Sequence, residues 1–237
     1  MANPFFRFKK FTVYQDKCAM KVGTDGVLLG LWTGIEHAGS CLDIGTGTGL
    51  ISLILAQKEH NLRIDAIDID KVAIEQAKEN IAASPFSDRI NCYHSSLQVY
   101  TEECGKKYDL IVSNPPFFQN SLKTPDNKRT LARHTDSLSV NELISSAVNL
   151  LSDRGKMCFI YPADYRDMLT ELAEINKLHI TRFTNVFPTP RANVKRILIE
   201  LSKEEKEISE NNLILEIERH RYSDDFRELA KNFYLNM

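Results

Sequence analysis

The stretch Leu42-Asp43-Ile44-Gly45-Thr46-Gly47-Thr48-Gly49 decides the fold of this 237-residue chain. Apolar residues predict a buried strand over residues 40–44, and the apolar run that follows predicts a helix over residues 50–58. Alternating glycines between a strand and a helix let the backbone turn sharply and let a ligand approach closely. Their GxGxG spacing differs from the GxGxxG spacing that cradles a pyrophosphate, so the sequence disfavours a nicotinamide dehydrogenase.

The second predicted strand, residues 63–67, ends in the acidic sequence AIDID and leads into a helix over residues 71–83. A carboxylate at this place can accept hydrogen bonds from both hydroxyls of a bound ribose, which we predict for Asp68. Asp43 ends the first strand, where its carboxylate either faces the other end of the same ligand or caps the following helix. Asp70 is predicted to be the N-cap of the second helix.

Strands and helices continue to alternate along the rest of the chain. Further strands are expected at residues 90–93, 108–113, 156–160, 179–186 and 195–201, and further helices at residues 141–151 and 163–174. This pattern predicts an α/β fold with a doubly wound, mostly parallel, seven-stranded sheet. Such sheets bind ligands beyond the carboxyl ends of their strands, where the strand order reverses. The tail adds an alternating segment at residues 213–217 and a polar helix from residue 224.

The composition predicts one compact cytoplasmic domain. The five cysteines are odd in number and none forms a CxxC pair, which indicates reduced thiols and no zinc site. No signal peptide begins the chain, and no apolar run reaches the ~20 residues that span a bilayer. The net charge of −2 disfavours a nonspecific nucleic-acid binder, so a nucleic-acid partner would need a local basic patch.

Together, LDIGTGTG and AIDID resemble motif I and the acidic loop of the Rossmann-like (class I) methyltransferases. The resemblance implies that the chain binds S-adenosyl-L-methionine through Gly45, Gly47, Gly49, Asp68 and Asp43. That superfamily often carries Asp after the third strand, where it binds the adenine amine. In this chain Ser96 stands at that place, and a hydroxyl accepts a hydrogen bond more weakly than a carboxylate does.

The fourth strand runs directly into Asn114-Pro115-Pro116-Phe117. An exocyclic base amine is a poor nucleophile because its lone pair is delocalised into the ring. A site that accepts both amine hydrogens frees that lone pair, and the Asn114 side chain and the Pro115 main-chain carbonyl are the predicted acceptors. Prolines hold the backbone and add no competing donor. The alternative is a strand-terminating turn without a catalytic role.

Phe117 offers a flat face on which an extruded target base can stack. Phe118 is assigned equally to the pocket and to the core. The polar segment at residues 117–135 is long for a connection within a compact domain, which makes it a candidate substrate loop.

The segment FTVYQDKCAMKVGTDG at residues 11–26 resembles the leader of the bacterial tRNA(Val) adenine-37 N6-methyltransferases. LARHT at residues 131–135 and the segment 190–196 resemble the same family. The resemblance implies that residues 1–33 form a leader over the cofactor site of the main domain, residues 34–237. It also implies that Lys21, Thr24 and Asp25 contact the methionine end of the cofactor. Phe117 stands where many relatives have Tyr, a change that keeps stacking and loses a hydroxyl.

A tRNA partner requires cations near the mouth of the site. The candidates are Lys9, Lys10, Lys17, Lys21, Lys123, Lys128, Arg129, Arg133, Arg191, Lys195 and Arg196. They can neutralise phosphates, or they can be ordinary solvated surface charges. His134 either contacts substrate or holds the loop. We expect a monomer without a bound metal and without a membrane segment.

Three other functions fit parts of this pattern. Enzymes that methylate guanine N2 of ribosomal RNA, or a glutamine of a release factor, share the NPP[YF] tetrapeptide. They usually carry an additional domain, for which the chain has no room. A noncatalytic module that binds the cofactor or RNA is disfavoured by the intact NPPF sequence.

Overall fold

A central eight-stranded sheet organises the computed structural model, which describes residues 3–18, 20–116 and 138–236. The strand order is β10 (Ser209–Ile214), β8 (His179–Phe187), β9 (Arg196–Ser202), β7 (Leu151–Pro162), β6 (Tyr108–Ser113), β3 (Ser40–Ile44), β4 (Arg63–Asp68) and β5 (Ile90–His94). Only β9 runs antiparallel to its neighbours in this sheet. The predicted α/β class with a mostly parallel sheet is confirmed.

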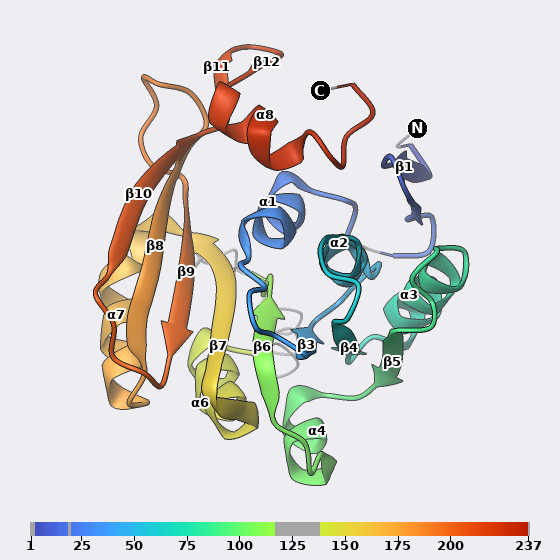
Figure 1. The fold of residues 1–237 in the computed structure, drawn as a ribbon, viewed down its shortest axis with the longest axis vertical. Helices are drawn as coiled ribbons and strands as arrows, with labels where there is room; N and C mark the ends of the chain where they lie inside the picture. The colour runs from blue at the N-terminus through green and yellow to red at the C-terminus, as the bar shows by residue number, and fades with distance from the viewer. Residues whose placement is uncertain (1–2, 19, 117–137, 237) are drawn as a thin grey trace, which may run out of the picture.

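Helices cover both faces of the sheet (Figure 1). One face carries α1 (Thr24–Trp32), α2 (Leu50–Lys58) and α3 (Lys71–Ala82); the other carries α4 (Leu97–Glu103), α6 (Val140–Leu150) and α7 (Arg166–Ile175), which follows the 3-10 turn η1 (Ala163–Tyr165). The alternation along β7 explains the two layers. Cys158 and Ile160 pack with α1 and α2 in one core, whereas Met157 and Phe159 pack with α6 in the other.

The sheet has one strand more than the seven expected. β10 pairs in parallel with β8 at the edge of the sheet, and its sequence SENNLI buries only Leu213. The expected segment began at Leu213, whereas the strand begins four residues earlier, at Ser209. An edge strand needs no apolar alternation when one side of its ladder faces solvent, so polar residues are tolerated there.

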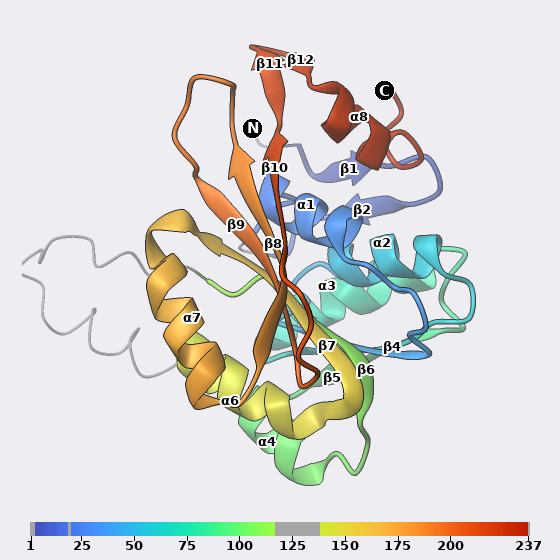
Figure 2. The same cartoon turned by 60° about the vertical axis from the view of Figure 1, so that its left-hand side comes forward.

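The two ends of the described chain lie against each other (Figure 2). The hairpin of β1 (Phe5–Arg7) and β2 (Thr12–Tyr14) lies beside α8 (Asp224–Ala230), which follows the short pair β11 (Glu216–Glu218) and β12 (Arg221–Tyr222). The ring centroids of Phe8 and Phe11 are 4.7 Å apart, and those of Phe8 and Tyr234 are 5.7 Å apart. These contacts anchor the hairpin in the same core as α1 and α2.

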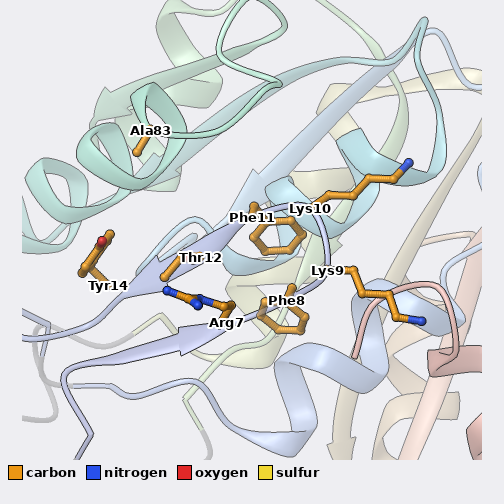
Figure 3. A pocket seen from close by; sticks show the side chains of 8 residues that line it. All are labelled: Arg7, Phe8, Lys9, Lys10, Phe11, Thr12, Tyr14 and Ala83. Carbon is orange, nitrogen blue, oxygen red and sulfur yellow. The ribbon is translucent and has the colours of Figure 1, made fainter. Parts of the chain in front are cut away.

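A small cavity of about 330 Å³ is lined by residues of this hairpin and by Ala83 at the end of α3 (Figure 3). Arg7, Lys9 and Lys10 are exposed residues of its wall, and Lys9 Nζ donates to the carbonyl of Lys231 at 2.6 Å. No acidic residue lines the cavity within the described part of the chain.

Candidate active site

A second, much larger cavity opens at the carboxyl ends of β3, β4 and β6. Its volume is about 1420 Å³. Most small-molecule pockets have ~300–1,000 Å³, so this one has room for a cofactor and a target group together. Because β4 and β6 flank β3, the cavity lies where the strand order reverses, as predicted. Its wall is built by the leader, the glycine loop (residues 45–49), the end of β4, the start of α4 and the end of β6.

Gly45, Gly47 and Gly49 have positive φ angles of 71°, 57° and 81°. Residues with a Cβ rarely adopt this backbone conformation. Gly45 and Gly47 line the cavity, and a Cβ added to either would meet no described atom within 4 Å. A Cβ on Gly49 would lie 3.5 Å from the Cβ of Ala77 on α3. The first two glycines therefore open the loop toward a ligand, while the third lets the loop pack closely on a helix.

Asp43 is fully buried beneath the loop and is absent from the described cavity wall. Its Oδ2 accepts hydrogen bonds from Thr46 Oγ1 at 2.7 Å, Ser52 Oγ at 2.7 Å and Ser52 N at 3.2 Å. Burial raises its pKa to about 6, and these hydrogen bonds oppose the shift. The N-cap of α2 is Gly49, and the bond from Ser52 N ties Asp43 to the first turn of this helix. A contact with the cofactor stays a prediction.

Asp68 lies on the cavity wall at the end of β4. Its Oδ2 accepts from Gly47 N and its Oδ1 from Asp70 N, each at 2.9 Å. Burial raises the pKa of this carboxyl, and the two backbone donors oppose the shift. Asp70 is confirmed as the N-cap of α3, because its side chain accepts from Val72 N at 2.8 Å. Asp68 is thus oriented by the loop itself and still borders the cavity.

Ser96 also lines the cavity, with Ser95, Leu97 and Gln98. Its Oγ accepts from Val99 N at 3.2 Å, so Ser96 is the N-cap of α4, a helix that the sequence analysis did not anticipate. The hydroxyl is therefore already engaged as an acceptor, although its own proton remains available for a ligand.

Asn114, Pro115 and Pro116 line the cavity where β6 ends. The Oδ1 atom of Asn114 is buried and has no hydrogen-bond partner among the described residues. On the other side of the amide, a Cβ added to Gly26 would lie 3.7 Å from Asn114 Nδ2. The start of α1 therefore packs against Asn114 and leaves its oxygen free. Phe117 lies outside the described residues, as do Phe118, Lys123, Lys128, Arg129, Arg133 and His134.

The leader contributes Lys21, Thr24 and Asp25 to the wall. Lys21 Nζ donates to the carbonyl of Gln15, and Arg196 Nε donates to Asp25 Oδ2 at 2.9 Å. Lys21, Thr24 and Asp25 line the same cavity as Gly45, Gly47 and Asp68. Their contacts with a cofactor stay predictions.

The wall also contains residues that the sequence did not single out, among them Gln98 and Glu142. Gln98 follows directly after the start of α4, and Glu142 belongs to α6. Glu142 forms a capping box with Ser139, and the spacing S-x-x-E at residues 139–142 is a sequence signal for such a box. Within residues 3–18, 20–116 and 138–236, no helix is long and apolar enough to cross a bilayer, and no cluster of side chains is placed to hold a metal ion.

S-adenosyl-L-methionine fits the residues of this cavity. Asp68 presents a carboxylate for ribose hydroxyls, and Gly45 and Gly47 leave open space beside the loop. No phosphate-binding spacing is needed, because the molecule carries no phosphate.

Comparisons with known proteins agree with this chemistry. Residues 20–179 match the sequence model of the family described as methyltransferase small domain. A protein of Parabacteroides distasonis called tRNA1(Val) (adenine(37)-N6)-methyltransferase is 53% identical over 100% of both chains. One of Trichodesmium erythraeum with the same name is 50% identical over 99% of both.

Solved structures show the same fold at low sequence identity. A predicted O-methyltransferase of Agrobacterium tumefaciens superposes with a TM-score of 0.65 at 15% identity, over 88% of this chain and 96% of the other. A ribosomal protein L11 methylase of Lactobacillus delbrueckii subsp. bulgaricus gives 0.58 at 18% identity, over 81% and 84%.

Fold and site define a Rossmann-like, class I methyltransferase whose cofactor is S-adenosyl-L-methionine. The chain belongs to the methyltransferase small domain family and, within it, to the family of the tRNA1(Val) (adenine(37)-N6)-methyltransferases.

Proposed function

We propose that this chain transfers the methyl group of S-adenosyl-L-methionine to N6 of adenosine 37 in tRNA1(Val). Relatives that carry this name match the whole chain at about half of its positions. The observation that carries the proposal is the buried, unpartnered Oδ1 of Asn114 at the wall of the large cavity. Buried acceptors normally find a donor, and an exocyclic amine supplies one.

Cofactor and target occupy different parts of the cavity in this proposal. Asp68 accepts hydrogen bonds from the ribose, and Gly45 and Gly47 let the cofactor approach the backbone closely. Ser96 borders the adenine. Lys21 and Thr24, on the leader, and Asp43, beneath the loop, act at the methionine end.

The bound cofactor supplies an activated methyl group on a sulfonium, so the enzyme's task is positioning rather than strong base catalysis. Asn114 Oδ1 accepts one hydrogen of the target amine, and the carbonyl of Pro115 accepts the other. The two prolines hold these acceptors at the end of β6 without offering a donor that would compete. The transfer would break the C–S bond of the sulfonium and leave S-adenosylhomocysteine, and the proton that the methylated amine loses would pass to solvent. Phe117 stacks on the target base.

On the described surface, some of the candidate cations are paired with carboxylates, so only part of the set is available to contact RNA phosphates. Lys17 is paired with Glu79, and Arg196 is paired with Asp25. Arg191 and Lys195 are exposed on the segment that joins β8 and β9. These two residues are therefore better placed than Lys17 to contact phosphates. The proposed tRNA substrate implies action in the cytoplasm, and a monomeric state remains our expectation.

Nucleoside analysis tests the proposal. Purified protein, labelled cofactor and an unmodified tRNA1(Val) transcript are incubated, and the digested nucleosides are separated and identified by mass spectrometry. We expect the label in N6-methyladenosine. Label in N2-methylguanosine, or no transfer to the transcript, would assign the chemistry of the site to a different substrate class.

A further inference from the structure

Two buried amide side chains on α3 hold the leader in place. Asn80 and Gln76 lie one helical turn apart, and both are fully buried. Asn80 Oδ1 accepts from Tyr14 N at 2.8 Å, and its Nδ2 donates to the Tyr14 carbonyl at 2.9 Å. Gln76 Oε1 accepts from Lys17 N at 3.0 Å. The main chain of the leader is thus bound by side chains of α3.

Asn80 binds the glycine loop at the same time. Its Nδ2 also donates to the carbonyl of Thr48 at 2.9 Å, and Thr48 lines the large cavity. A primary amide has two N–H groups. In Asn80 one serves the leader and the other serves the loop, while the oxygen accepts from the leader. One side chain therefore joins the leader to the loop that faces the cofactor.

The hydrogen bonds continue from this junction into the cavity wall. Gln15 follows Tyr14, and its Oε1 accepts from Val22 N at 2.6 Å. Lys21 Nζ donates to the main-chain carbonyl of Gln15. Lys21 and Val22 line the cavity, and α1 begins at Thr24, two residues after Val22. The position of this wall therefore depends on how residues 14–17 are held on α3.

We propose that Asn80 and Gln76 are positioning residues that couple docking of the leader to binding of S-adenosyl-L-methionine. The inference rests on the proposed function only in assigning the cofactor to the large cavity. If docking of the leader tightens cofactor binding, the cofactor tightens docking by the same factor. Undocking would break the three hydrogen bonds that join Asn80 and Gln76 to the main chain of the leader, while the bond from Asn80 Nδ2 to the Thr48 carbonyl would remain.

The variants Asn80→Leu and Gln76→Leu test this coupling. Asn80→Leu removes the bonds to the leader and to the loop. Gln76→Leu leaves the loop bond of Asn80 intact and removes the bond to Lys17 N, together with a 3.4 Å bond from Gln76 Nε2 to Glu79 Oε2. Gln76 is absent from the described cavity wall. Leu150→Ala provides a matched control, because it empties part of the core on the opposite face of the sheet. Calorimetry measures the affinity for S-adenosylhomocysteine, and hydrogen exchange follows the amides of Tyr14, Lys17 and Val22.

We expect both amide variants to weaken S-adenosylhomocysteine binding on the order of tenfold and to accelerate exchange at the three leader amides. The ligand should protect these amides in the wild type and protect them less in the variants. Leu150→Ala should lower the melting temperature and leave the affinity unchanged. Wild-type affinity in Gln76→Leu would overturn the coupling. Failure of the wild type to bind S-adenosylhomocysteine would instead contradict the proposed function.

Discussion

At the scale of single residues, Asn114 combines burial with an unused acceptor. Its Oδ1 has no partner among the described residues, although it borders a cavity. We expect Asn114→Ala to lower kcat by about 10²–10³-fold, the usual effect of deleting one preorganised hydrogen-bonding group. The affinity for S-adenosylhomocysteine should stay nearly unchanged, because Asn114 contacts the target. Single-turnover kinetics and calorimetry measure the two quantities. Substantial turnover in this variant would remove Asn114 from catalysis.

Asp43 gives a prediction about pH. Burial raises its pKa to about 6 from an ordinary value of 3.8. Stability from a group with a raised folded-state pKa is fully present below the unfolded value and is lost as pH rises through the folded value. The free energy of unfolding of the wild type should therefore fall relative to Asp43→Asn between pH 4.5 and pH 7.5, on the order of 2 kcal/mol. Urea unfolding at the two pH values checks this.

Asp65→Asn serves as a control of opposite sign. Burial alone would raise the pKa of Asp65, but hydrogen bonds from Lys106 and Tyr108 lower it below the usual value. Its contribution to stability is therefore lost as pH falls. The difference between wild type and Asp65→Asn should shrink toward acid pH, whereas the difference for Asp43→Asn should move the other way. Parallel pH profiles for the two variants would contradict the assignment.

At the scale of elements, substitutions at two glycines should distinguish the packing of helices from the binding of the cofactor. Gly30 on α1 faces α2, where an added Cβ would lie 3.0 Å from Ile54 Cγ2. Gly30→Ala should therefore destabilise the fold by about 1–3 kcal/mol, with little effect on the cofactor. Gly47 faces open space in the cavity at a φ of 57°. Gly47→Ala should weaken S-adenosylhomocysteine binding, because alanine is strained at this positive φ and its methyl group would occupy open space on the cavity wall. Thermal unfolding and calorimetry on both variants distinguish the effects; equal losses of affinity would contradict this division.

The elements with clear periodicity were predictable from sequence. The parallel strands β3, β4 and β6 are short apolar runs, and their ends place the glycine loop, Asp68 and Asn114 at one edge. α1 was missed because its residues from Gly26 to Trp32 are all buried, so no polar stripe marks a helical period.

Contacts between distant parts of the chain were not predictable in the same way. Asn80 and Tyr14 are 66 residues apart, and no sequence motif around either residue predicts their hydrogen bonds. Ser96 was assigned to the cofactor because of its position in a motif, and the structure adds a local role as the N-cap of α4. The spacing of the motifs was therefore enough to locate the site. The contacts that support it could be identified only from the folded structure.

At the scale of the whole molecule, binding of a polyanion must overcome a net charge of −2. Lys128, Arg129 and Arg133 follow the NPPF sequence and lie outside the described residues. Replacing all three by Gln should raise the KM for tRNA and flatten its salt dependence, because fewer counterions are released. Cofactor affinity should not change. Steady-state kinetics at several salt concentrations measure the slope.

A second triple variant tests whether the rise in the KM for tRNA results only from the change in net charge. Arg154, Lys177 and Lys206 lie near the amino edge of the sheet, opposite the large cavity. Replacing these three by Gln changes the net charge by the same amount. The KM for tRNA should then rise far less than in the first variant. Equal effects of the two triple variants would argue against a local RNA contact by the segment after NPPF.

The most direct test of the account replaces one nucleotide of the substrate. Two tRNA1(Val) transcripts are compared, one with adenosine at position 37 and one with purine riboside, which lacks only the exocyclic amine. With labelled cofactor, the account predicts methylation of the first transcript, located at N6 of nucleotide 37 by mass spectrometry, and none of the second. Equal methylation of both transcripts, or methyl groups found only at another nucleotide, would contradict it.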